Sequence, residues 1–231
     1  MISAAKELEF LKSFIQYQGR KAARDKSECR RKEILDAALR IVAREGVRGV
    51  KHRAVAKEAN VPLASTTYYF KDIEELISDA FMLFAEKSLQ GVELFYSELH
   101  ALLSNYDIKE IQCDAEVMDR FIISLVNIGA NYIKDQLEFR RQDVLTEVAL
   151  LSEAVRDERL KPLARAYRDI WHGRLTDFFI LINSSAPKED AMLIISAVQG
   201  LLYEGVINDG GIDDVKIKSI LKRAINVLVQ S

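Results

Sequence analysis

Apolar residues recur every three or four positions along almost the whole chain, which is the spacing of one helix face and not the alternation of a strand. Between residues 28 and 45, for example, Ile34, Ala38, Ile41 and Val42 share one face. Only three prolines and ten glycines interrupt the 231 residues. The pattern therefore predicts an all-α fold.

Breaks in this pattern divide the chain after residue 27 into predicted helices. Gly46 and Gly49 end the first helix, and Asn60 and Pro62 separate two short ones, because these residue types favour helix ends and turns. The nine predicted helices span residues 28–45, 52–59, 61–69, 73–103, 115–137, 141–155, 159–182, 187–207 and 213–229.

The two short helices and the tight turn between them form a helix-turn-helix candidate over residues 52–69. Val55, Ala56 and Ala59 are small enough for the two helices to cross closely, and Val61 is apolar at the turn. In this motif the second helix enters the major groove of DNA, while the preceding helix and its flanks hold the phosphates.

Charge is distributed unevenly along the chain. Residues 1–70 carry 15 Lys and Arg against 8 Asp and Glu, whereas residues 71–231 carry 18 against 27. A basic segment on an acidic body suits binding to a polyphosphate, since each Lys or Arg near a phosphate releases condensed counterions. A chance cluster of solvated charges is the alternative.

Ordered blocks of sequence occur at residues 31–38, 45–46, 55–61, 69–70 and 74–77. In these blocks and their spacing, the N-terminal part resembles the TetR family of bacterial transcriptional regulators. The resemblance implies a three-helix DNA-binding domain followed by a helical domain that binds a small molecule and dimerises. We accordingly divide the chain into an N-terminal extension (1–27), a helix-turn-helix DNA-binding domain (28–72) and an effector-binding and dimerisation domain (73–231).

Carried over residue by residue, the resemblance assigns DNA contacts in and around the helix-turn-helix. The predicted phosphate contacts are His52, Ser65, Thr67 and Tyr69, the predicted base contacts are Arg53, Leu63, Ala64 and Tyr68, and Lys51 and Lys71 supply further positive charge. Tyrosines at helical spacing more often belong to a core, so Tyr68 and Tyr69 are not equal candidates. Three residues depart from the family pattern: Thr66 is polar where an apolar residue is usual, Thr67 replaces a tyrosine, and Ile73 replaces a lysine.

The last two predicted helices carry broad apolar stripes beside the small residues Ser196, Ala197 and Gly200. Small residues allow close helix approach, and the resemblance implies a four-helix bundle between two subunits. Two ordinary core helices would show a similar pattern. The predicted dimer-interface residues are Ile194, Ile195, Val198, Leu201, Leu202, Ile217, Ile220, Leu221, Ala224 and Leu228.

The resemblance also implies a small-molecule pocket, built from the long helix at residues 73–103 and the three that follow it. Aromatic side chains and a few polar ones within apolar segments suit a hydrophobic or amphipathic effector. Each of these residues could instead fill the core. The candidate effector contacts are Phe84, Phe121, Asn127, Asn131, Tyr167, Trp171 and His172.

Other classes of function find little support. The sequence holds no GxSxG, HExxH, P-loop or GxGxxG motif, its three histidines are scattered, and Cys29 and Cys113 lie far apart without a metal-ligand spacing. Uncharged runs such as residues 191–203 are too short for a membrane span, and no signal peptide is evident. We expect no enzyme activity, no cofactor, no metal and no membrane partner.

The predicted protein is a cytoplasmic homodimer that binds a near-palindromic double-stranded DNA operator and is released by a small-molecule effector. The alternative is a helical protein-interaction adaptor that keeps the helix-turn-helix as a scaffold. Repression is the family's usual mode, and activation stays open, as do the operator sequence, the effector's identity and the role of residues 1–27. That segment could form an extra helix or a basic arm for the minor groove.

Overall fold

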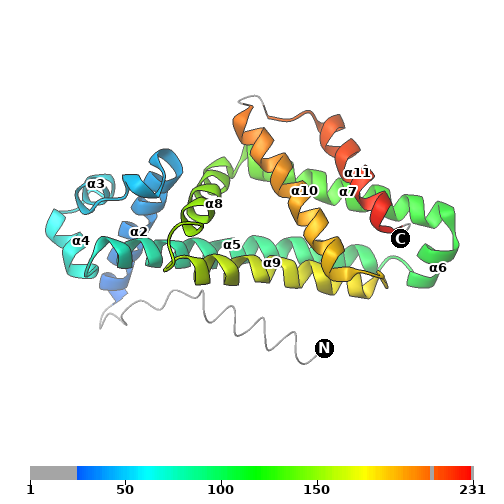
Figure 1. The fold of residues 1–231 in the computed structure, drawn as a ribbon, viewed down its shortest axis with the longest axis horizontal. Coiled ribbons are helices and arrows are strands. Elements are labelled where there is room, and N and C mark those ends of the chain that lie inside the picture. The colour runs from blue at the N-terminus through cyan, green and yellow to red at the C-terminus, as the bar shows by residue number, and fades with distance from the viewer. Residues whose placement is uncertain (1–24, 209–210, 230–231) are drawn as a thin grey trace. The chain divides into compact units, whose positions relative to one another are not determined.

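The computed structural model describes residues 25–208 and 211–229, which hold α-helices, one short 3-10 helix and no strand (Figure 1). The all-α prediction is confirmed. The predicted N-terminal extension lies outside the described residues up to residue 24. The helices are α2 (Asp25–Glu45), η1 (Val47–Gly49), α3 (His52–Glu58), α4 (Leu63–Tyr69), α5 (Ile73–Leu103), α6 (Ile108–Cys113), α7 (Ala115–Glu138), α8 (Arg141–Ala154), α9 (Lys161–Leu181), α10 (Pro187–Ile207) and α11 (Asp214–Val229).

The predicted helices all occur, and their ends differ from the prediction by at most a few residues. The six-residue helix α6 was not predicted, because it spans fewer than two turns and buries only Ile111. Aspartates begin α6 and the next helix: Asp107 accepts a hydrogen bond from the Lys109 backbone N–H (2.8 Å), and Asp114 accepts one from Glu116 (2.8 Å).

The described chain forms two compact units. Among the described residues, the first unit contains 25–89 and 142–169, and the second contains 90–141, 170–208 and 211–229. The first unit therefore holds α2, η1, α3, α4, the first half of α5, α8 except its first residue Arg141, and the start of α9. Ion pairs from α2 to α5, Arg31 with Asp79 and Asp36 with Lys87, explain why the start of α5 belongs with the helix-turn-helix.

The first unit is built around a core in which α2 contributes Ile34, Leu35 and Ile41. Val55 of α3 and Phe70, which follows α4, are fully buried as well. Two predicted turn residues have the left-handed backbone expected of them, Gly46 at φ 74° and Asn60 at φ 51°. These turns fix where α2 ends and how α3 leads to α4.

In the second unit, α7 packs against both α10 and α11. Gly205 of α10 permits a close approach of α7, because a Cβ there would lie 2.4 Å from Leu137 Cδ1.

Among the described residues, α10 is also long and apolar enough to pass a length and composition test for a membrane span. Core helices of proteins outside membranes pass the same test, so it is weak evidence for a membrane.

Candidate functional site

The helix-turn-helix is formed by α3 and α4 of the first unit. Val55 and Ala56 are buried on α3, and Thr66 is buried on α4. The Thr66 hydroxyl donates a hydrogen bond to the Leu63 carbonyl oxygen (2.8 Å), which satisfies the buried polar group. A threonine at this usually apolar position is therefore compatible with the motif.

The outer surface of α4 consists of three of the four predicted base-contact residues together with Thr67, while the fourth, Arg53, lies on α3. Leu63, Ala64, Thr67 and Tyr68 are exposed, and the Tyr68 side chain is 77% exposed. Tyr69 is half-buried, and its hydroxyl oxygen lies 3.3 Å from Ser27 Oγ within hydrogen-bond distance. The structure thus separates the two tyrosines: Tyr68 faces solvent, and Tyr69 packs partly against the unit.

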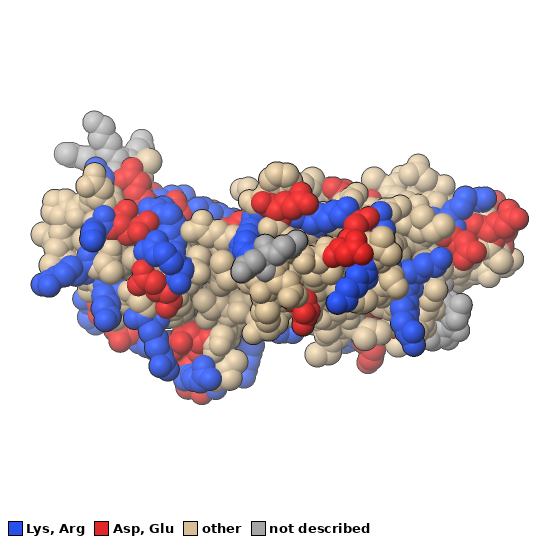
Figure 2. Space-filling model, turned by 90° about the horizontal axis from the view of Figure 1, so that it is seen from above, with Lys and Arg blue, Asp and Glu red and all other residues tan. Residues whose placement is uncertain are grey.

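Basic side chains flank this surface. Lys51, Arg53 and Lys71 are exposed, and among the described residues none of them forms an ion pair. His52 is half-buried at the start of α3, and its Nδ1 has no hydrogen-bond partner in the described part of the chain. On the face shown in Figure 2, lysine and arginine side chains gather over the end that carries α3 and α4, with acidic side chains between them.

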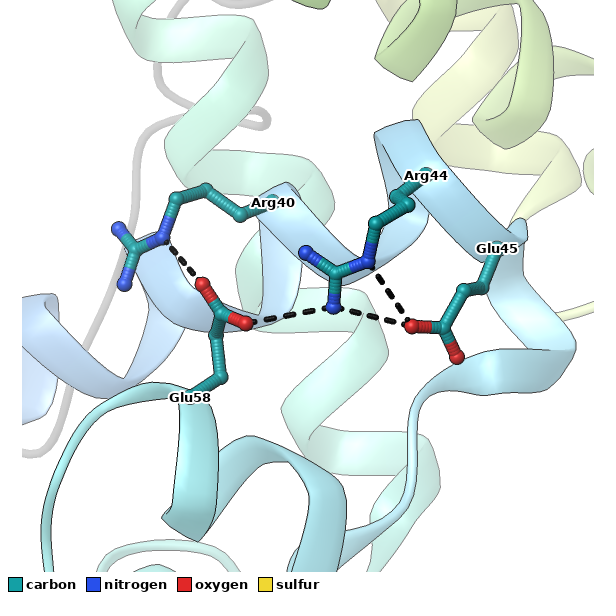
Figure 3. A network of polar contacts seen from close by, with 4 residues as sticks. All are labelled: Arg40, Arg44, Glu45 and Glu58. Carbon is teal, nitrogen blue, oxygen red and sulfur yellow. Dashed lines mark hydrogen bonds and ion pairs between the residues drawn. The ribbon is translucent and has the colours of Figure 1, made fainter.

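Two arginines of α2 bind Glu58 of α3 (Figure 3). Arg40 Nε donates to Glu58 Oε1 (2.8 Å), and Arg44 Nη2 donates to Glu58 Oε2 (3.2 Å). Arg44 Nε also bonds Glu45 Oε1 (3.0 Å). The hydrogen bond from Arg40 is the main reason that the pKa of Glu58 lies below its usual range. The charges of Arg40 and Arg44 are therefore compensated within the unit.

A buried ion pair joins α2 to α5. Arg31 is 4% exposed, and its guanidinium bonds the Asp79 carboxylate and lies 4.8 Å from the centre of the Phe70 ring. Glu75 Oε1 lies 3.9 Å from Arg31 Nη2. Burial raises the pKa of Asp79 to about 6, although the charge of Arg31 opposes the shift. The pair connects the first helix of the DNA-binding domain to the helix that follows the motif.

Two predicted effector contacts, Phe84 and Tyr167, lie together in the first unit. Their ring centres are 5.8 Å apart, and the Phe81 ring lies 6.4 Å from that of Tyr167. Glu147 of α8 accepts a hydrogen bond from Tyr167, and burial raises its pKa to about 7. Sequence reasoning missed Glu147, because a glutamate on an amphipathic helix is normally solvated.

Replacing Glu147 with glutamine is expected to stabilise the protein at pH 8 and much less at pH 5. Protonation of this carboxyl stabilises the folded state below pH 4.5, and the effect is lost as the pH rises through about 7, so a neutral side chain gains at high pH. Because solvent partly screens the group, we expect a gain of about 1–2 kcal/mol at pH 8 in urea unfolding. The exposed Glu98→Gln is the control, and equal gains at both pH values would contradict the prediction.

The other predicted effector contacts lie in the second unit and do not form one site. Phe121 is fully buried in its core, and Trp171 and His172 are half-buried on α9. Asn127 and Asn131 are exposed, which corrects their assignment to an interior pocket. At i and i+4 they share one face of α7, and this face is opposite the one that carries the buried residues.

The second unit instead contains a small cavity, of about 50 Å³, between α5, α7, α9, α10 and α11. None of the seven predicted effector contacts lines it. The lining residues are Phe95, Leu99, Leu125, Gly129, Leu175, Phe178, Phe179, Ile194, Val198, Leu221 and Ile225.

The predicted dimer stripe also lies largely inside the second unit. Ile194, Val198 and Ala224 are half-buried, and only Ile220 is exposed. The remaining six are buried in the protomer and offer little surface to a partner: Ile195, Leu201, Leu202, Ile217, Leu221 and Leu228. A different face of α10 is exposed and apolar, formed by Met192, Leu193, Ser196, Gly200, Tyr203 and Ile207.

Comparison with known families identifies the chain. The model described as "Bacterial regulatory proteins, tetR family" matches residues 34–80, which include α3 and α4. The model described as "Tetracyclin repressor-like, C-terminal domain" matches residues 124–230. The chain belongs to the TetR family. The expectation of a transcriptional regulator that is not an enzyme is therefore confirmed.

Individual TetR-family proteins are similar over different lengths. The regulator PksA of Bacillus subtilis is 38% identical over 60 residues, which cover 26% of this chain and 29% of PksA. The regulator BetI of Burkholderia cenocepacia is 23% identical over 205 residues, 88% of this chain and 96% of BetI. A structure of the multidrug binding protein EbrR complexed with ethidium is 25% identical with a TM-score of 0.55, covering 84% of this chain and 97% of EbrR.

Proposed function

We propose that the protein is a cytoplasmic repressor whose homodimer binds a near-palindromic operator through α4 and is released by a small apolar or amphipathic effector. The observation that carries the DNA-binding part is the exposed surface of α4 with the largely exposed Tyr68, together with Lys51, Arg53 and Lys71, which form no ion pair with the described residues. Apolar and aromatic groups suit contact with thymine methyl groups, and the lysines and arginine suit phosphates or guanine.

The exposed face of α10 supports the homodimer. Met192, Tyr203 and Ile207 contribute apolar surface, and Ser196 and Gly200 let a second helix approach closely. On α11, Ile220 and Val227 are exposed as well. A second copy of the chain would cover both faces with the same residues, as a two-fold interface requires. The dimer would then present two α4 helices about 34 Å apart to successive major grooves.

Release by an effector rests on two arguments. EbrR was crystallised with ethidium, which supports a small-molecule effector for this family member too. A ligand releases DNA only if it favours the arrangement of the dimer in which the two α4 helices no longer fit the operator. An apolar cavity between α5, α7, α9, α10 and α11 of the described second unit also supports the proposal.

The proposal is tested by selecting bound fragments from genomic DNA with the purified protein. We expect a near-palindromic sequence to be enriched, and Arg53→Ala and Tyr68→Ala each to weaken binding to it by about 5- to 150-fold, the range for a lost base contact of about 1–3 kcal/mol. Arg53→Ala should also reduce the salt dependence of binding, since a positive charge near the phosphates is removed.

Two matched variants serve as controls. Phe139 is 79% exposed, close to the exposure of Tyr68, and Arg156 is exposed without an ion pair among the described residues. Phe139→Ala and Arg156→Ala should leave binding unchanged, because neither residue belongs to the helix-turn-helix or lies near α3 or α4 in the sequence. If no DNA sequence is enriched at low salt, or if the control variants lose as much DNA affinity as Arg53→Ala and Tyr68→Ala, the adaptor alternative is favoured.

A further inference from the structure

We propose that a proton on the buried carboxylate of Asp79 weakens DNA binding, because it lets Arg31 compete for Glu75, which holds the backbone at the end of α4. This inference rests on the proposed function, because it adds a means of regulation to the same DNA-binding surface. The three residues belong to the first unit, in which they connect α2, the end of α4 and the start of α5.

The Arg31 side chain lies where these three elements meet. Its guanidinium bonds the Asp79 carboxylate of α5 and lies 4.8 Å from the centre of the Phe70 ring, which directly follows α4. All three side chains are buried. A buried positive charge depends on its acidic neighbours, because water no longer compensates it.

Glu75 connects this cluster to the turn between α4 and α5. Its Oε2 accepts a hydrogen bond from the Lys71 backbone N–H (2.6 Å), and its Oε1 lies 3.9 Å from Arg31 Nη2. Asp72 Oδ1 accepts a hydrogen bond from the Glu75 backbone N–H (2.8 Å). Reciprocal bonds of this kind at a helix start fix how the chain enters the helix. Glu75 thus shares one carboxylate between the end of α4 and Arg31.

Protonation of Asp79 changes the balance between these contacts. While Asp79 is ionised, it compensates the charge of Arg31, and Glu75 holds the Lys71 N–H. When Asp79 is neutral, the attraction between Arg31 and Glu75 is no longer shared with a second carboxylate, and their separation is already small. Glu75 is then expected to turn toward Arg31 and to release the Lys71 backbone. DNA binding weakens, because ordering the end of α4 again on the operator costs free energy.

The surroundings of Asp79 set the pH at which this happens. Burial raises its pKa to about 6, the charge of Arg31 opposes the rise, and the charges of Glu75 and Glu28 add to it. Arg31 and Glu28 act from α2, and Glu75 lies one turn away on α5. If only the ionised form binds DNA, the apparent affinity follows the ionised fraction, which falls about tenfold between pH 7.5 and pH 5.

A loss of DNA affinity at pH 5 would not reflect unfolding caused by this carboxyl. Because the pKa of Asp79 is raised in the folded state, its contribution to stability is fully present below pH 3.8 and is lost as the pH rises through about 6. The group therefore favours folding more at pH 5 than at pH 7.5. The expected changes in DNA affinity and in stability have opposite signs.

Operator binding as a function of pH tests the inference, by fluorescence anisotropy with the DNA recovered in the genomic selection. We expect the ratio of affinities at pH 7.5 and pH 5 to be about ten times larger for the unaltered protein than for Asp79→Asn, which copies the neutral carboxyl and should bind weakly at both pH values. Glu75→Gln keeps an oxygen that can accept the Lys71 N–H but loses the charge that attracts Arg31, so it should bind well at both. Any gain from protonated histidines at low pH is common to these proteins and cancels in the comparison.

Asp36→Asn is the matched control. Asp36 of α2 forms an ion pair with Lys87 of α5, so it links the same two helices, but both side chains are more than a third exposed. We expect Asp36→Asn to keep the pH dependence of the unaltered protein, because no buried charge depends on this pair. If Asp36→Asn abolishes the pH dependence as Asp79→Asn does, the buried pair has no special role and the inference is wrong.

The backbone amide of Lys71 reports the same event without DNA. Its NMR resonance should move with a midpoint near pH 6 in the unaltered protein, because its hydrogen bond with Glu75 is lost as Asp79 takes up a proton. In Asp79→Asn the resonance should stay constant over this pH range.

Two results would overturn the inference: the same pH dependence of DNA binding in the unaltered protein and in Asp79→Asn, or a Lys71 resonance that does not follow the titration. The two proposals fail separately, because the amide measurement needs no operator. If no DNA is enriched, the proposed function is refuted whatever the amide shows. If an operator is recovered but the Lys71 amide does not respond, the function stands and its control by Asp79 is wrong.

Discussion

Replacing Arg31 with methionine is expected to lower the free energy of unfolding by about 3–5 kcal/mol, the typical cost of removing one partner of a buried ion pair. The Asp79 carboxylate would remain buried between α2 and α5 without its opposite charge. The variant would also lose the contact of the guanidinium with the Phe70 ring. Urea unfolding monitored by circular dichroism measures the loss at pH 7.

The pH dependence of this loss identifies its cause. Burial already raises the pKa of Asp79 to about 6 in the presence of Arg31, and removal of Arg31 would raise it further. A protonated Asp79 no longer needs a partner, so Arg31→Met should be less destabilising at pH 5 than at pH 8. The double variant Arg31→Met with Asp79→Leu should recover most of the stability, because no buried charge is left.

Arg30 provides the matched control. It is the exposed neighbour of Arg31 and pairs with Glu33 on the same helix at 2.9 Å. An exposed ion pair of this kind contributes about 0–1 kcal/mol, so Arg30→Met should be close to neutral. If Arg30→Met and Arg31→Met lower the free energy of unfolding equally, the loss comes from removing any arginine of α2 and not from breaking the buried ion pair.

Local features of the sequence were sufficient to predict the helix-turn-helix. Gly46 and Asn60 adopt the left-handed backbone that their residue types permit, and the helices lie where the apolar spacing places them. The helix α6 was missed because a helix of six residues is too short for periodicity to appear. Thr66 departs from the family pattern, but its own helix supplies the acceptor for its hydroxyl.

The sequence could not predict which apolar helix faces are buried inside the protomer and which stay exposed on its surface. A periodic stripe shows that a helix has an apolar side, but it does not show what covers that side. On α10 both sides are apolar: Ile195 and Leu201 point into the core, while Met192 and Tyr203 are exposed. Most of the residues predicted for the dimer interface belong to the apolar side that is buried inside the protomer.

The buried carboxylates illustrate a similar limit. Asp79 is next to apolar residues on α5, and its partner Arg31 is 48 positions earlier, so no local pattern links them. Glu147 of α8 meets Tyr167, which lies in the part of α9 that belongs to the first unit, 20 positions later in the chain. Contacts between residues far apart in the chain decide the charge state of both groups, and single-sequence periodicity contains no information about them.

Gly200→Arg is expected to convert the protein into a monomer. The exposed apolar face of α10 has Gly200 at its middle, and nothing in the protomer lies within 4 Å of a Cβ at this position, so an arginine should not disturb the fold. In a two-fold dimer the same face meets its own copy, so each subunit would bring a positive charge and a large side chain to the interface. Sedimentation equilibrium should then give a mass close to that of one protomer, which is 26.2 kDa without the substitution.

Gly173→Arg is the matched control, because its Cβ also meets open space but lies on α9, away from the proposed interface. It should remain a dimer. Like charges brought together across an interface cost several kcal/mol, so Gly200→Arg should raise the dimer dissociation constant by about a thousandfold. Binding to the full operator should fall with it, since a monomer reaches only one half-site, while affinity for an isolated half-site stays unchanged. Such a result would separate the role of α10 in pairing from that of α4 in reading DNA, whereas a Gly200→Arg variant that stays dimeric would show that a different surface holds the two copies together.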